Sequence, residues 1–99
     1  MLPFDVPHNR IAGFCRQHHI RRLAFFGSAL RDDFRPDSDV DILVDFEQGY
    51  VPGFLGIARI ERELCEMLGV RVDLRTSGEL SRYFRDEVVA DSLVEYVAG

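Results

Sequence analysis

The segment from Asp39 to Glu47 alternates between apolar and mostly acidic residues. Side chains two residues apart on a β-strand point to the same side, so this pattern predicts a strand with one apolar face. The apolar face carries Val40, Ile42, Val44 and Phe46, and the other face carries Asp39, Asp41, Leu43, Asp45 and Glu47. Such a strand needs a second layer to cover its apolar side, so the chain has to build a layered sheet.

Helical and strand patterns alternate along the rest of the chain. The spacing of Ile11, Phe14, Cys15 and His18 predicts a first helix, with His18 near its C-terminal end. An apolar run over 23–26, ended by Gly27, predicts a buried strand. The later elements are a helix from Ile57 to Leu68 ended by Gly69, a strand over 70–75, a helix over 80–88 and an edge strand over 93–97. With 99 residues, 46% of them hydrophobic, the chain has room for one domain. We expect residues 1–99 to form a single α/β (α+β) domain, with a small mixed sheet of three or four strands flanked by helices.

The acidic face of the predicted strand is its unusual feature. Asp39 and Asp41 project side by side, with Cα atoms roughly 6.5–7 Å apart. Two carboxylates this close repel each other unless water or a cation lies between them, and Mg²⁺ is commonly held by one or two carboxylates together with substrate phosphates. A merely solvent-exposed strand face would carry the same Asp-x-Asp pattern, so the pair alone leaves both interpretations open.

Two further features favour phosphate chemistry. Gly27 and Ser28 directly follow a buried strand, where a glycine allows close backbone approach and free N–H groups bind phosphate oxygens. Asp73 lies on the polar side of the third strand, and it joins Asp39 and Asp41 if that strand neighbours the second. Taken alone, Gly27 and Ser28 could be a common turn, and Asp73 could be a solvent-facing aspartate. Together, three carboxylates beside a phosphate-binding turn are the ingredients of two-metal phosphoryl transfer.

The stretches FGSALR, from Phe26 to Arg31, and RPDSDVDILV, from Arg35 to Val44, resemble the signature of polymerase-β-superfamily nucleotidyltransferases. The chain is most similar to the minimal nucleotidyltransferases called MNT proteins, over almost its whole length, which implies a polymerase-β-like core. The resemblance implies that Asp39, Asp41 and Asp73 are catalytic and bind two Mg²⁺ ions, and that Gly27, Ser28, Arg31 and Ser38 contact the nucleoside triphosphate. Many members carry a basic residue directly after Gly-Ser, where this chain has Ala29.

The same resemblance implies a role. MNT proteins of this kind act as antitoxins of HEPN ribonuclease toxins, and some transfer AMP from ATP to a toxin tyrosine. We therefore expect a Mg²⁺-dependent transfer of AMP from ATP to a hydroxyl group, most simply a tyrosine, of a HEPN-family toxin within a hetero-oligomer. Two alternatives remain: an antitoxin that neutralises its toxin by complex formation without catalysis, and nucleotidyl transfer to a small molecule or an RNA end.

Composition narrows the other partners. The net charge is -5, and all 12 basic residues are arginine, so broad coating of nucleic acid is not expected. The two cysteines form no C-x-x-C pair, and the N-terminus shows no secretory signal. No apolar run approaches the roughly 18 residues that a membrane span needs. These features predict a cytoplasmic protein with reduced thiols and no membrane contact.

Overall fold

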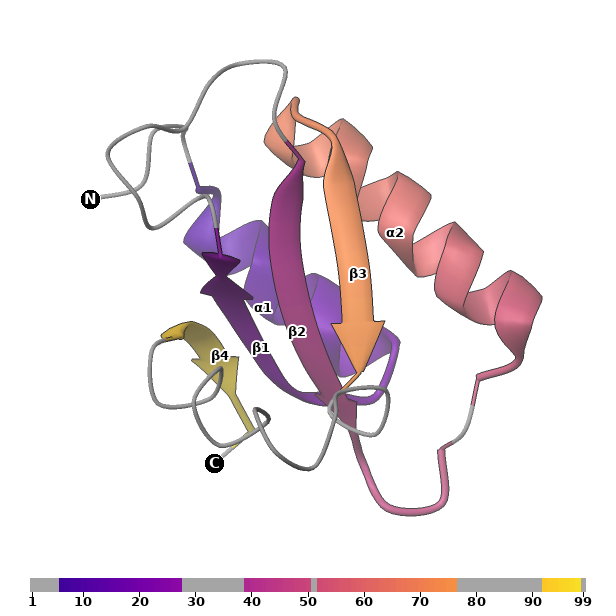
Figure 1. Cartoon of the computed structure of the whole chain (residues 1–99). Helices are drawn as coiled ribbons and strands as arrows, with labels where there is room; N and C mark the ends of the chain where they lie inside the picture. Colours follow the sequence, from indigo (N-terminus) through magenta and orange to yellow (C-terminus); the bar gives the residue numbers. More distant parts are fainter. Residues whose placement is uncertain (1–5, 28–38, 51, 77–91, 99) are drawn as a thin grey trace.

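The computed structural model describes residues 6–27, 39–50, 52–76 and 92–98 (Figure 1). The helices are α1 (His8–Gln17) and α2 (Phe54–Leu68), and the strands are β1 (Ile20–Phe26), β2 (Val40–Phe46), β3 (Val72–Thr76) and β4 (Leu93–Val97). The strands form one sheet, and Figure 1 shows both helices on the same face of it. Neither helix of the described ranges is long and apolar enough to cross a membrane.

The sheet is mixed, with the strand order β3-β2-β1-β4. Strand β2 is antiparallel to β1 and parallel to β3, while β4 is antiparallel to β1 at the far edge. Helix α2 connects β2 to β3, because parallel neighbours need a crossover that returns the chain to the same end of the sheet. The expected fold class is confirmed, and so is the edge strand predicted over residues 93–97.

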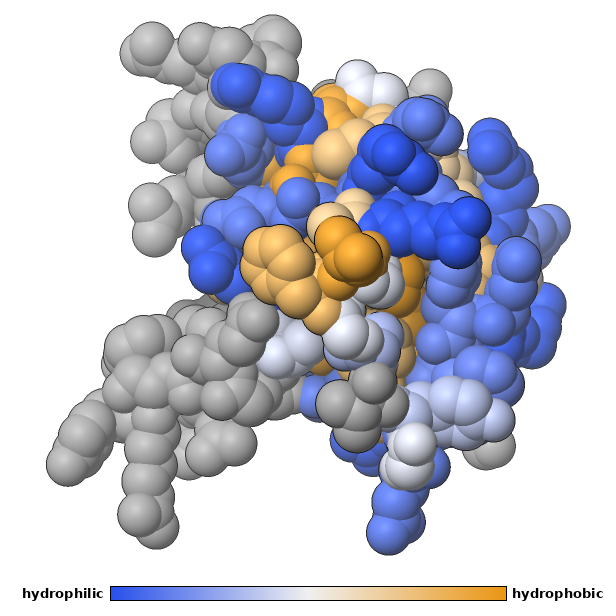
Figure 2. Space-filling view, turned by 90° about the vertical axis from the view of Figure 1, so that its right-hand side faces the viewer, coloured by the Kyte–Doolittle hydropathy of each residue, from blue (hydrophilic) through white to orange (hydrophobic). Residues whose placement is uncertain are grey.

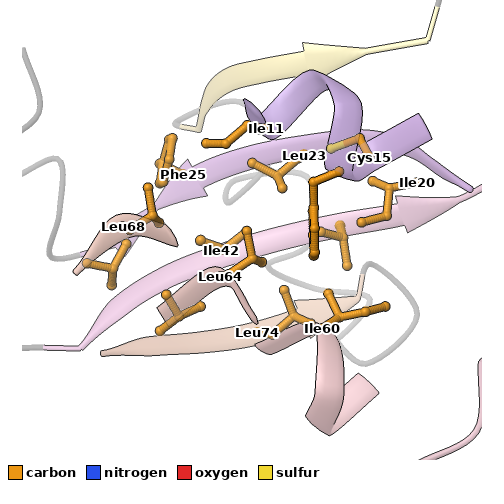
Figure 3. Packing of buried hydrophobic residues seen from close by; sticks show 14 residues of the cluster. Ile11, Cys15, Ile20, Leu23, Phe25, Ile42, Ile60, Leu64, Leu68 and Leu74 are labelled. Atoms are coloured by element: carbon orange, nitrogen blue, oxygen red, sulfur yellow. The ribbon is translucent and has the colours of Figure 1, made fainter. Parts of the chain in front are cut away.

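The core fills the space between the sheet and the two helices (Figure 3). Val40, Ile42 and Val44 of β2 are fully buried there, as their alternation predicts, whereas Phe46 is only partly buried. Helix α1 contributes Ile11, Phe14 and Cys15, and α2 contributes Ile60, Leu64 and Leu68. Leu43 lies on the opposite face of β2 but is also buried, so that face is not uniformly exposed.

Several predicted boundaries shift in the structure. Helix α2 begins at Phe54, three residues before the predicted start at Ile57. The prediction began too late because the apolar side chains of the first turn point outward and do not fit an inward helical pattern. His18 directly follows the last residue of α1, Gln17, as predicted for a residue at the helix end, and its Nε2 lies 3.0 Å from Glu63 Oε2. Gly69 ends α2 at φ +71°, as predicted. The helix predicted over 80–88 lies outside the described residues.

The outer edge of β3 is tied to α2 by two hydrogen bonds. The Val72 N–H donates to Cys65 Sγ at 3.2 Å, and the Leu74 N–H donates to Glu61 Oε2 at 2.9 Å. Both acceptors come from one side of α2, because residues four apart on a helix lie one above the other. These bonds satisfy edge N–H groups that would otherwise be open, and they fix the backbone on both sides of Asp73.

Candidate active site

Three strands bring the candidate residues to one end of the sheet. Asp41 is in register with Phe26 of β1 on one side and with Asp73 of β3 on the other. Because the neighbouring residues Val40 and Val72 point into the core, Asp41 and Asp73 project from the opposite face of the sheet. The third strand is the neighbour of the second and places Asp73 opposite Asp41, while Asp39 lies just before the start of β2.

Gly27 and Asp41 are in direct contact at this end. Gly27 has a left-handed backbone, with φ +71°, and a Cβ placed on it would overlap Oδ2 of Asp41 and lie 3.1 Å from its Cγ. Glycine is therefore needed twice at this position, once for its backbone conformation and once for the space that the carboxylate occupies. Sequence reasoning assigned Gly27 only to the approach of a nucleotide, so its support of Asp41 was missed.

Two arginines lie beside the outer aspartates. Arg71 Nε is 3.3 Å from Asp39 Oδ1, and an Arg75 guanidinium nitrogen is 3.1 Å from Asp73 Oδ2. All four side chains are largely or partly exposed, so solvent screens both pairs and each is weak. Both arginines lie in the sequence of the strand predicted over 70–75, and neither was predicted as part of the site. Their position two residues from Asp73 is the signal that would have placed cations next to the carboxylates.

The donor set suits Mg²⁺ in its chemistry. It consists of carboxylate oxygens on two adjacent strands, the ligand type that this hard cation prefers. Within the described ranges, however, no group of three or more His, Cys, Asp or Glu side chains lies close enough to hold a metal ion. Asp39 and Asp73 instead contact Arg71 and Arg75. Ser28, Arg31 and Ser38, the other residues assigned to the nucleotide, lie outside the described residues.

A pocket of about 450 Å³ opens along the outer edge of β3. Asp73 and Arg75 line it from β3, and Phe54, Ile57 and Glu61 line it from the first half of α2. The pocket therefore lies along the outer edge of the sheet and connects Asp73 with the surface of a helix. Sequence reasoning missed it, since its α2 residues lie more than ten positions from Asp73 and carry no motif.

Comparison with known proteins agrees with this geometry. The family model of the nucleotidyltransferase domain matches residues 8–97. A candidate protein adenylyltransferase of Methanocaldococcus jannaschii is 32% identical over 77 residues, which is 78% of this chain and 81% of the relative. The protein adenylyltransferase MntA of Thermococcus cleftensis is 47% identical over 55 residues, which is 56% of this chain and 54% of that protein.

Solved structures give the same picture. A candidate minimal nucleotidyltransferase shares 35% identity and a TM-score of 0.72, over 87% of this chain and 86% of its own. A toxin–antitoxin complex with AMP-PNP superposes with a TM-score of 0.74 at 20% identity, and the match covers 94% of this chain and 75% of the other. The structure of a tri-AMPylated Shewanella oneidensis HEPN toxin in complex with an MNT antitoxin gives a TM-score of 0.66 at 20% identity, and the match covers 92% of this chain and 70% of the other. At such identity these two complexes establish the fold alone.

The match over residues 8–97 and the relatives above show that the chain belongs to the nucleotidyltransferase domain family, an enzyme family that transfers nucleotidyl groups.

Proposed function

We propose that this chain is the antitoxin of a HEPN toxin and that it transfers AMP from ATP to a hydroxyl group of that toxin, in the first instance a tyrosine. The observation that carries the proposal is the pairing of Asp41 with Asp73 across parallel strands, next to the side-chain-free Gly27. Two observations support the choice of AMP and of a protein acceptor. The relatives are named protein adenylyltransferases, and one of the similar solved structures is a complex of an AMPylated HEPN toxin with an MNT antitoxin.

Asp39, Asp41 and Asp73 would hold the magnesium ions. Bound there, the ions would supply charge neutralisation at the triphosphate. Gly27 lets the backbone come close to the phosphates, and Ser28, Arg31 and Ser38 would bind the triphosphate. These assignments rest on the family motif and on the position of Gly27 at the end of β1.

The protein's part in the reaction is to position the acceptor and take up its proton. The toxin hydroxyl oxygen attacks the α-phosphorus of ATP in line, a P–O bond forms, and the bond to pyrophosphate breaks. Asp73 orients the hydroxyl and accepts its proton, since it is the aspartate that also lines the pocket open to an acceptor from outside. The reaction belongs in the cytoplasm, where the free thiols of Cys15 and Cys65 stay reduced.

A transfer assay tests the proposal. The protein is incubated with α-labelled ATP, Mg²⁺ and the product of the neighbouring gene, and label on that partner is the expected result. Asp39→Ala and Asp41→Ala should abolish labelling, whereas Asp45→Ala, an acidic residue further along the same strand, should leave it unchanged. An unlabelled partner would reject the transfer.

The same variants separate catalysis from binding. A non-catalytic antitoxin is the second candidate. The ion pairs of Asp39 and Asp73 with arginines favour it, because these carboxylates already have cationic partners without a metal ion. If Asp39→Ala and Asp41→Ala neutralise the toxin as well as the wild type does, neutralisation works by complex formation. Label on a small molecule or an RNA end, with none on the protein partner, would identify the third candidate.

A further inference from the structure

We propose that the outer face of α2, formed by Phe54, Leu55, Ala58, Arg59 and Arg62, is the surface that docks the toxin, and that it takes a segment bearing apolar and acidic side chains. This inference rests on the proposed function, because it assigns the partner of that reaction to a specific place on the chain. Three features of this face support the assignment: the exposure of Phe54 and Leu55, the charge of its arginines and its continuity with the pocket at Asp73.

The apolar pair at the start of α2 is unusually exposed. Phe54 is 87% and Leu55 is 82% accessible, the highest values among the large apolar residues of the described ranges. Figure 2 shows apolar atoms standing out among hydrophilic side chains on the side of the molecule that carries α2. Scattered apolar residues are normal on a surface, but two adjacent, protruding ones are typical anchors for a partner.

The arginines next to this pair give the face its charge. Arg59 and Arg62 are exposed, and neither forms an ion pair with any residue of the described ranges. Together with Leu55 they line a shallow hollow of about 470 Å³. On a chain of net charge -5, this is a local basic and apolar surface, and its complement is an apolar segment that carries carboxylates.

The face is continuous with the candidate active site. Ala58 lines both this hollow and the pocket that contains Asp73, and Phe54 lies at the rim of the latter. A segment held on α2 would therefore have a path across the edge of β3 to Asp73. This continuity favours a macromolecular acceptor over a second copy of the chain, since only the acceptor has to reach that carboxylate.

The experiment measures binding of the purified product of the neighbouring gene to variants of the full chain by isothermal titration calorimetry. Leu55→Asp and the double variant Arg59→Glu/Arg62→Glu should each weaken the complex at least about tenfold, with a smaller salt dependence for the double variant. Arg10→Glu is the matched control, because it reverses an exposed arginine on α1, away from this face. Binding of ATP with Mg²⁺ should be the same in all of them, which shows an intact nucleotide site.

Each outcome separates the two proposals. If the α2 variants bind the toxin as the wild type does, the docking surface is wrong and the proposed function stands. If they lose binding but the wild type binds without transferring label, the docking surface stands and the transfer fails. If the wild type does not bind the protein at all, both are overturned. If Leu55→Asp instead dissociates a homodimer in sedimentation, the face joins two copies of the chain and the docking proposal is rejected.

Discussion

The carboxylate of Asp41 packs directly against the Cα of Gly27, in the space that any side chain at position 27 would need. Gly27 directly follows β1, and Asp41 of β2 lies opposite the last residue of that strand, Phe26. The contact links the turn that follows β1 to the carboxylate that is in register with Asp73. Gly27 thus leaves the space that the Asp41 carboxylate occupies in the candidate site.

Gly27→Ala should therefore do two things: destabilise the fold by about 1–2 kcal/mol through its left-handed backbone, and displace Asp41. Gly69→Ala is the matched control, since Gly69 has the same φ of +71° but nothing within 4 Å of an added Cβ. Both variants should lose similar stability in urea unfolding, and only Gly27→Ala should also lose transfer activity. Equal activity in the two variants would show that Asp41 does not depend on the contact.

The Glu61 side chain should stabilise the edge of the sheet. Its carboxylate accepts the Leu74 N–H at 2.9 Å, so Glu61→Ala should cost about 1–3 kcal/mol by leaving a partly buried donor unpaired. Glu61→Gln keeps an acceptor and should cost less. Glu66→Ala, an exposed glutamate on the same helix, is the control and should change stability by less than about 0.5 kcal/mol. Hydrogen exchange of the Leu74 amide should accelerate only in Glu61→Ala; unchanged exchange there would contradict the bond.

Cys15 should make the fold sensitive to alkaline pH. Burial, with a further contribution from the charge of Glu95, raises the pKa of Cys15 from 9.0 to about 12. Above pH 9 the unfolded thiol loses its proton while the folded one keeps it, so the free energy of unfolding falls by up to about 1.4 kcal/mol per pH unit until the folded pKa is reached. Below pH 9 this contribution is fully present.

Denaturant titrations between pH 8 and 11 check this, with Cys15→Ala as the reference. The variant should be less stable at pH 8 because it leaves a small cavity in the core. Its stability should nevertheless decline less steeply with pH than that of the wild type. Parallel curves would mean that the Cys15 thiol does not couple folding to pH.

The fold could be predicted largely from the sequence, because periodicity reports burial directly. The alternation of Val40, Ile42 and Val44 gave a strand and its buried face, and Gly69 gave the end of a helix. His18 could be placed at the end of the first helix, whereas its contact with Glu63 depends on how the two helices pack and has no signal in the sequence.

The site was only partly predictable. The three aspartates could be identified as candidates by type and spacing, but their meeting depends on β3 lying next to β2, which is a tertiary choice. The contact between Gly27 and Asp41 depends on the register of β1 against β2, and no local pattern encodes that register. The exposure of Phe54 and Leu55 was not predicted, and Phe54 was expected in the core, because an apolar side chain in a sequence is most simply interpreted as buried.

The most direct test of the account asks whether Asp41 and Asp73 hold the same metal. Mn²⁺ binding, measured by electron paramagnetic resonance with a non-hydrolysable ATP analogue present, is compared for the wild type, Asp41→Asn, Asp73→Asn and the double variant. Each single substitution should weaken binding at least about 10–100-fold. The double variant should lose clearly less than the sum of the two free-energy losses, as expected for ligands of one site. Strictly additive losses, or single variants that bind Mn²⁺ like the wild type, would contradict a shared metal site on β2 and β3.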